Sequence, residues 1–345
     1  MRKFTVASQQ SDSDSGRFSG GAASANSSFR TQETKPPMYI LVHVAALDRS
    51  IYLSVAKEAL VCHIKQKLLE QFGDLLNDAL NFGLFLPAMN GRNGKFLEED
   101  RLVSAYVTSE TTAALEFIYK KRINTGSAHT PTQQDMIKHH LPQSFLRYVT
   151  RGDTKKVEKL LANGLDPNFV CQRSGESPLA IAAMRSKPSA LIGILIEGGA
   201  HKDFRSRGGI TPLHKAAAIG NFEAVKSLLD FGQSPNSLDA NGLTPLYHNI
   251  LGDVDTRICH RLLYEHAQIG IEDVNGRQEI HQVSAGEAAI LGRIEQLNLL
   301  IMYGADVNVR SSPGRQTANR PALPVRTTKS PTRQQRIEVA RAGQT

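Results

Sequence analysis

The sequence predicts a small α+β domain followed by an all-α repeat solenoid, with a polar tail at each end. Three observations carry this prediction. A Ser/Thr-Pro-Leu motif recurs at near-constant spacing in the second half of the chain. β-rich runs and one amphipathic segment occupy the region before it. Both ends are rich in small and polar residues and hold few large apolar groups.

The solenoid is defined by a tetrapeptide that opens each copy. The copies begin Ser177-Pro178-Leu179-Ala180, Thr211-Pro212-Leu213-His214 and Thr244-Pro245-Leu246-Tyr247, so that their prolines lie 34 and then 33 residues apart. The Ser or Thr hydroxyl caps a helix N-terminus, and proline at the first helical position loses no hydrogen bond. One helix pair cannot bury its apolar face alone, so such units stack. This period and motif are the signature of ankyrin repeats.

We expect about five ankyrin repeats over residues 143–310. The first lacks the motif and is typical of a capping unit, whereas the fifth has Gln278-Glu279-Ile280-His281 in the motif position and is longer than the others. Its extra residues, within 283–290, either lengthen the first helix or bulge from it. The sequence shows no polar cap after this repeat, so we expect an exposed last apolar face and a shortened form of a longer protein.

Residues 38–122 are expected to form the α+β domain. β-rich runs occur at 39–44, 51–55, 82–86 and 115–119, and an apolar helical face begins near residue 60. Two strands, a helix and then further strands predict a sheet covered by one helix, the ubiquitin-like arrangement. The polar, turn-rich residues 123–142 are expected to link this domain to the repeats.

The charge lies in the tails. Of the net charge of +8, residues 1–36 contribute +2 and residues 311–345 contribute +6, which leaves the rest neutral. The sequence therefore predicts no basic face on the folded part, and nucleic acid is an unlikely partner. Residues 1–37 and 311–345 are expected to be disordered. The alternative function is electrostatic binding of anionic membrane or nucleic acid through the basic C-terminal tail.

Nothing in the sequence indicates an enzyme, a cofactor or a metal site. His214 and His281 stand in the motif position, where hydrogen bonding between adjacent repeats is the usual role. No nucleophile and carboxylate are spaced around them as catalysis requires. Three widely spaced cysteines favour a reducing, intracellular setting without disulfides or zinc. No apolar run is long enough for a transmembrane segment.

Specific strings indicate a family. They are Ala79–Phe85, Gly94–Leu97, Gly164–Phe169, Gly242–His248 and Gln278–Gln282. With these strings, residues 38–310 resemble the N-terminal region of the Shank (ProSAP) postsynaptic scaffold family. The resemblance implies a Shank N-terminal domain, similar to Ras-association domains, that binds GTP-bound Ras and Rap GTPases. It also implies an ankyrin array that binds α-spectrin (fodrin) and sharpin-like proteins, and a cytoplasmic location at the postsynaptic density or the cell cortex and its junctions.

Three sets of residues are candidates for protein binding. The resemblance places the GTPase face on the first two strands, where Leu41 or His43 and Ile51 replace the family's basic residues. The nearby basic candidates are Arg49, Lys57 and Lys65. On the concave side of the array the candidates are Arg205, Arg207, Lys215, Tyr247, His248 and Gln282, with a merely solvated surface as the alternative. In the tail, Pro321, Pro324 and Arg326 form the PxxPxR pattern of an SH3 ligand, with chance occurrence as the alternative.

Overall fold

The computed structural model describes most of the two predicted folded regions. The described residues are 38–56, 58–88, 93–107, 114–122, 142–252, 254–284 and 290–309. Lys57, the SH3-ligand pattern, both tails and most of the expected linker lie outside the described residues.

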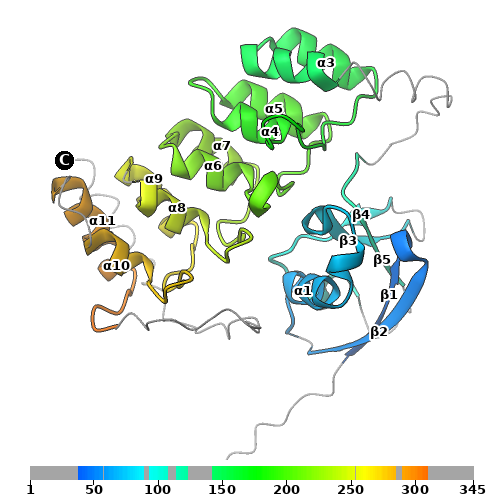
Figure 1. Ribbon diagram of the computed structural model, residues 1–345, viewed down its shortest axis with the longest axis horizontal. Helices are drawn as coiled ribbons and strands as arrows, with labels where there is room; N and C mark the ends of the chain where they lie inside the picture. The colour runs from blue at the N-terminus through cyan, green and yellow to red at the C-terminus, as the bar shows by residue number, and fades with distance from the viewer. Residues whose placement is uncertain are drawn as a thin grey trace, which may run out of the picture. The chain divides into compact units, whose positions relative to one another are not determined.

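The α+β domain is a five-stranded sheet with one helix on its face (Figure 1). Its strands are β1 (Met38–Val44), β2 (Arg49–Val55), β3 (Phe82–Leu86), β4 (Lys95–Phe96) and β5 (Leu115–Tyr119), in the order β2-β1-β5-β3-β4. The central pair β1–β5 is parallel, and the other neighbours are antiparallel. This order, with helix α1 (Val61–Phe72) between the second and third strands, is the predicted ubiquitin-like arrangement. Short 3₁₀ turns complete the domain at Ala45–Leu47, Gly73–Leu75, Ala79–Asn81 and Val103–Ala105.

The core of this domain follows from two sequence periods. Alternate residues of β1 are buried, as period two requires, and Val42 is fully buried. On α1, Ile64, Leu68 and Phe72 recur every four residues and are buried against the sheet residue Phe117 and its neighbours. The same face of α1 also buries a lysine, discussed below.

The second region is a stack of helix pairs in chain order (Figure 1). A helix over residues 142–151 precedes α3 (Thr154–Ala162). The following pairs are α4 (Pro178–Ala183) with α5 (Ser189–Glu197), α6 (Pro212–Ala218) with α7 (Phe222–Asp230), α8 (Pro245–Gly252) with α9 (Thr256–Tyr264), and α10 (Glu279–Ser284) with α11 (Ile290–Met302). A 3₁₀ turn, Arg207–Gly209, precedes α6.

The motif residues perform the expected local tasks. The Thr211 hydroxyl accepts a hydrogen bond from the His214 backbone N–H, and Pro212 is the first residue of α6. The His214 ring bonds the Leu243 carbonyl oxygen of the next repeat at 3.0 Å. Burial lowers the pKa of His214 to about 3, so the ring is neutral and serves to join adjacent repeats. His281 bonds the Val309 carbonyl oxygen in the same way at 3.0 Å.

The fifth repeat differs from the others in the length of its second helix. Its first helix, α10, is six residues long and its second, α11, is thirteen. Residues 285–289, which make up most of the range 283–290 where the insertion is expected, are not described. Ile294, Ile301 and Met302 on α11 are about half exposed, as expected for an apolar face that no further described repeat covers. Within the described ranges, none of the helices has the length and apolarity needed to cross a membrane.

Candidate protein-binding surfaces

Three of the expected concave-side residues occupy one position in successive repeats. Lys215, His248 and Gln282 each stand four residues after the first motif residue. The His248 ring bonds Asp239 at 2.9 Å, and the Gln282 amide bonds Asp273 at 3.2 Å. Both acids lie five residues before the motif, in the hairpin that leads into the same repeat. The His248 and Gln282 side chains therefore stabilise the hairpins of their own repeats through hydrogen bonds.

Lys215 has no such acid in its own hairpin, because Ser206 stands at that position. Its ammonium group instead reaches the preceding repeat and pairs with Glu176 at 2.5 Å. Tyr247 is fully buried, and its hydroxyl donates to the Arg277 carbonyl oxygen at 3.0 Å. Lys215 and Tyr247 thus contribute chiefly to cohesion between repeats.

The two arginines of this set have opposite environments. Arg205 is 7% exposed, and its guanidinium donates to the carbonyl oxygens of Gly209 and Leu238. Arg207, two residues later, is exposed at the tip of the hairpin. Only Arg207 of this pair is placed to meet an external partner.

The candidate GTPase face has a free strand edge. β2 is the first strand in the sheet order, so one side of its backbone has no neighbouring strand among the described residues. Arg49 begins β2 and is exposed. Lys65 has a different position from the expected one: it is 4% exposed on α1, and its ammonium donates to the Leu80 carbonyl oxygen and to Glu99. It is not available to an external GTPase while these bonds are present.

Lys65 belongs to a buried cluster of charges that joins the α+β domain to the repeats. Glu99 accepts from Lys65 at 2.7 Å and from Lys120 at 2.9 Å, and Arg205 lies 3.5 Å from its other oxygen. Lys120 also pairs with Asp203 of the second repeat. We call these five residues the charge cluster. Each cation has an anion within reach, which offsets part of the cost of burial.

The pKa values follow from this arrangement. Burial lowers the pKa of Lys65 to about 8, although Glu99 opposes the effect. Burial alone would raise the pKa of Glu99, but Lys120, Lys65 and Arg205 outweigh it and hold that pKa well below its usual range. The cluster is therefore ionised at Glu99 throughout the physiological range.

Neutral groups surround the cluster and fix its register. The Asn81 amide exchanges two hydrogen bonds with the Arg205 backbone, at 2.8 Å to the carbonyl oxygen and 2.7 Å from the N–H. Tyr119 meets the Phe204 ring edge to face. The two Asn81–Arg205 bonds are buried and reciprocal, so they fix the register of this contact.

The end of β5 is clamped to the repeats over three consecutive residues. Lys120 pairs with Asp203, the Lys121 carbonyl oxygen bonds the His201 ring at 2.8 Å, and the Arg122 guanidinium donates to the Leu161 carbonyl oxygen at 2.6 Å. We call residues 120–122 the β5 clamp. It fixes the chain where it leaves the sheet.

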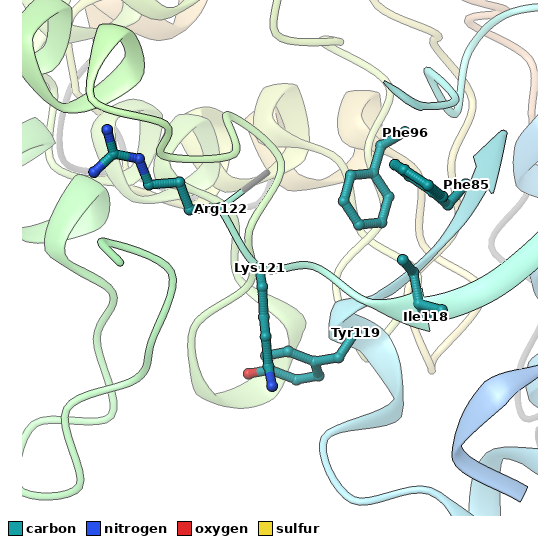
Figure 2. Close-up of a pocket in the computed structure, with 6 residues that line it drawn as sticks. All are labelled: Phe85, Phe96, Ile118, Tyr119, Lys121 and Arg122. Atoms are coloured by element: carbon teal, nitrogen blue, oxygen red, sulfur yellow. The ribbon is translucent and has the colours of Figure 1, made fainter. Parts of the chain in front are cut away.

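A hollow of about 330 Å³ lies beside the β5 clamp. It is lined by Phe85, Phe96, Ile118, Tyr119, Lys121 and Arg122. Figure 2 shows the two phenylalanine rings together on one side and the Arg122 side chain extending away from them. Because that guanidinium is bonded to Leu161, the hollow has an aromatic wall but no convergent set of free polar groups.

The described residues contain no group of three or more His, Cys, Asp or Glu side chains that could hold a metal ion. The two cysteines with strongly shifted pKa values are also poor nucleophiles. Burial raises the pKa of Cys62 to about 11 and that of Cys259 to about 12, so both thiols stay protonated.

The comparisons with known proteins agree with this geometry. An ankyrin-repeat sequence profile matches residues 145–239 and 213–311. Human SH3 and multiple ankyrin repeat domains protein 2 is 38% identical over 297 residues, which is 83% of this chain and 15% of that protein. Mouse SH3 and multiple ankyrin repeat domains protein 1 is 42% identical over 250 residues, which is 71% of this chain and 11% of that protein. Over this aligned region the chain belongs to the Shank family. It spans about one seventh or less of the length of these Shank relatives.

Sequence reasoning about this Shank-family chain missed the charge cluster, but one signal was present. Asn168 and Asn236 stand four residues after the glycine that ends their repeats, and each bridges to the loop of the next repeat. In the second repeat the same position holds Asp203. Its carboxylate does not make that bridge and pairs with Lys120 instead. The aspartate at position 203, where the other two repeats have asparagine, therefore marked the place where Lys120 of the α+β domain contacts the repeats.

Proposed function

We propose that this chain is a non-enzymatic adaptor of Shank type, which holds cytoskeletal and signalling proteins on its ankyrin array. The observation that carries the proposal is the ankyrin stack itself, found in a sequence homologous to Shank proteins. Such stacks expose hairpin tips and first helices along one side, which suits extended partners.

The partners we propose for the array are α-spectrin (fodrin) and sharpin-like proteins. The test is calorimetric titration of the full chain, and of a chain without residues 143–310, with purified α-spectrin repeats. Binding by the full chain and not by the shortened one is the expected result. Equal binding by both would remove this role from the array, provided that circular dichroism shows the shortened chain to be folded.

We further propose that the α+β domain binds Ras- or Rap-family GTPases in their GTP-bound form along β2. The free edge of β2 supports backbone pairing with a strand of the GTPase. Arg49 supplies an exposed cation at the start of that strand, suited to an acidic effector surface. Lys65 is not part of this proposal, since it is buried in the charge cluster.

A titration with GTPases loaded with GTP analogue or with GDP tests the second proposal. GTP-selective binding that falls about twofold to fivefold in Arg49→Ala is expected for one exposed ion pair. Arg101→Ala removes an exposed arginine from another part of the domain and serves as the control. Binding that does not distinguish GTP from GDP would refute the proposal. We place the adaptor in the cytoplasm, at the postsynaptic density or the cell cortex and its junctions, as the resemblance to the Shank family implies.

A further inference from the structure

The hairpin tips of the repeats differ in charge along the stack. Four residues before the motif, successive repeats carry Arg173, Arg207, Ala240 and Val274. One residue earlier they carry Gln172, Ser206, Asp239 and Asp273. At these two positions, therefore, the second and third repeats have a base without an acid, and the fourth and fifth have an acid without a base.

The acids of the later tips are occupied within the protein. Asp239 accepts from His248 and from the backbone N–H groups of Asn241 and Leu243. Asp273 accepts from Gln282 and likewise from two backbone N–H groups of its own hairpin. The carboxylates of Asp239 and Asp273 are thus hydrogen-bonded within the protein and have few acceptor positions left for a partner.

The two arginines are not occupied. Arg173 and Arg207 are both exposed, and within the described ranges neither guanidinium forms a hydrogen bond or an ion pair. They are also neighbours, because the Arg207 backbone N–H donates to the Gly175 carbonyl oxygen at 2.8 Å. Gly175 has φ +74°, and a Cβ there would lie 3.1 Å from that of Arg207. Glycine thus lets the second and third tips come together.

The charge of the whole array reinforces this local pair. Residues 143–208 contain eleven basic and six acidic side chains, whereas residues 209–310 contain seven basic and twelve acidic ones. The neutral total of the folded part conceals a positive first half and a negative second half. A partner with acidic residues is drawn toward the first half and repelled by the second, which fixes its register on the array.

We propose that the tips of the second and third repeats bind an extended, acidic peptide segment of a partner protein through Arg173 and Arg207. The proposal rests on the adaptor function proposed above and names the chemistry of one partner segment. Packed helices of neighbouring repeats lie about 8–10 Å apart. An extended chain rises about 3.3 Å per residue. The two carboxylates that meet the arginines should therefore be about three residues apart.

Fluorescence anisotropy with the full chain tests this inference. The probe is a fluorescein-labelled peptide containing Glu-Thr-Val-Glu between Gly-Ser ends, and the matched probe contains Gln-Thr-Val-Gln. The Arg173→Ala/Arg207→Ala variant should bind the acidic probe about tenfold more weakly, since each exposed charge pair changes affinity about threefold. Binding by the intact chain should also weaken between about 50 mM and about 150 mM salt.

The control variant is Lys155→Ala/Lys159→Ala, which removes the same charge from exposed positions on α3. It should change the affinity less than about twofold, and a photo-crosslinking form of the probe should label residues 171–177 and 205–210. Three results would each overturn the inference: equal loss in both variants, equal binding of the glutamine probe, or no binding by the intact chain. If the arginine variant still binds α-spectrin, such a result would refute this inference alone and would not contradict the proposed adaptor function.

Discussion

Glu279 makes the attachment of the fifth repeat sensitive to pH. It stands where the second, third and fourth repeats have proline, and it is fully buried. Its carboxylate accepts hydrogen bonds from the backbone N–H groups of Gly270 and Ile271 at 2.9 and 3.2 Å. Burial raises the pKa of this carboxyl from 4.5 to about 7, although the two N–H groups oppose the rise. Cys259 on α9 is close enough to interact electrostatically, but burial keeps it a neutral thiol over this range.

The sign of the effect follows from the direction of the shift. The folded state holds the proton more tightly than the unfolded state, so the stabilisation is fully present below pH 4.5 and is lost as pH rises through about 7. The rise in pKa from 4.5 to about 7 corresponds to roughly 3 kcal/mol of unfolding free energy. The local opening free energy of α10 and its preceding loop should therefore fall by about this amount between acid and slightly alkaline pH.

Hydrogen–deuterium exchange of peptides covering residues 270–283 measures this opening free energy, after correction for the intrinsic pH dependence of exchange. Glu279→Gln is the matched variant, because it keeps the size of the side chain and cannot titrate. Its opening free energy should lack the decline seen in the unmodified chain. Parallel pH profiles for the two proteins would refute the reasoning, whatever the constant offset between them.

Three further predictions concern stability and can be measured by urea denaturation followed by circular dichroism. Glu99→Gln leaves three buried cations with one fewer anion and should lower the free energy of unfolding by about 3–5 kcal/mol. The control Glu98→Gln, at a more exposed position, should lower it by less than about 1 kcal/mol. Equal losses would contradict the account of the charge cluster. Asn221→Ala removes the N-cap of α7 and two hydrogen bonds to the preceding repeat. The free energy of unfolding should therefore fall by about 1–3 kcal/mol, and an unchanged value would contradict these roles of Asn221. Leu228→Ala empties a fully buried position in the repeat core and should cost about 3–5 kcal/mol; a loss below about 1 kcal/mol would show that the site collapses.

Local chemistry made much of the fold predictable. Thr211 and Pro212 start α6 through contacts within one turn, so the sequence alone locates that helix. The alternating burial of β1 is equally local. The burial of Lys65 and Arg205, in contrast, does not depend on residues near them in the sequence. Their charge predicts exposure, but Glu99 lies 34 residues from Lys65 along the chain and brings both into the interior.

The candidate binding residues show the same division. Repeat spacing alone puts Lys215, His248 and Gln282 at one recurring position, four residues after the first motif residue. It does not reveal that acids in the hairpins occupy their polar groups, because that pairing depends on how each hairpin folds back over its helix. The exposed Arg173 was overlooked for the opposite reason: its importance appears only when its neighbours in the other repeats are compared in space.

The β5 clamp has a consequence for a cut chain. Lys120, Lys121 and Arg122 hold the end of the sheet to the repeats through side-chain and backbone bonds that do not involve residues 123–141. The covalent connection through those residues is therefore not what keeps the two regions in contact. A protease that cleaves only there should yield two polypeptides that still migrate as one species on a sizing column. Separately produced halves should find each other in solution and reconstitute the uncut protein.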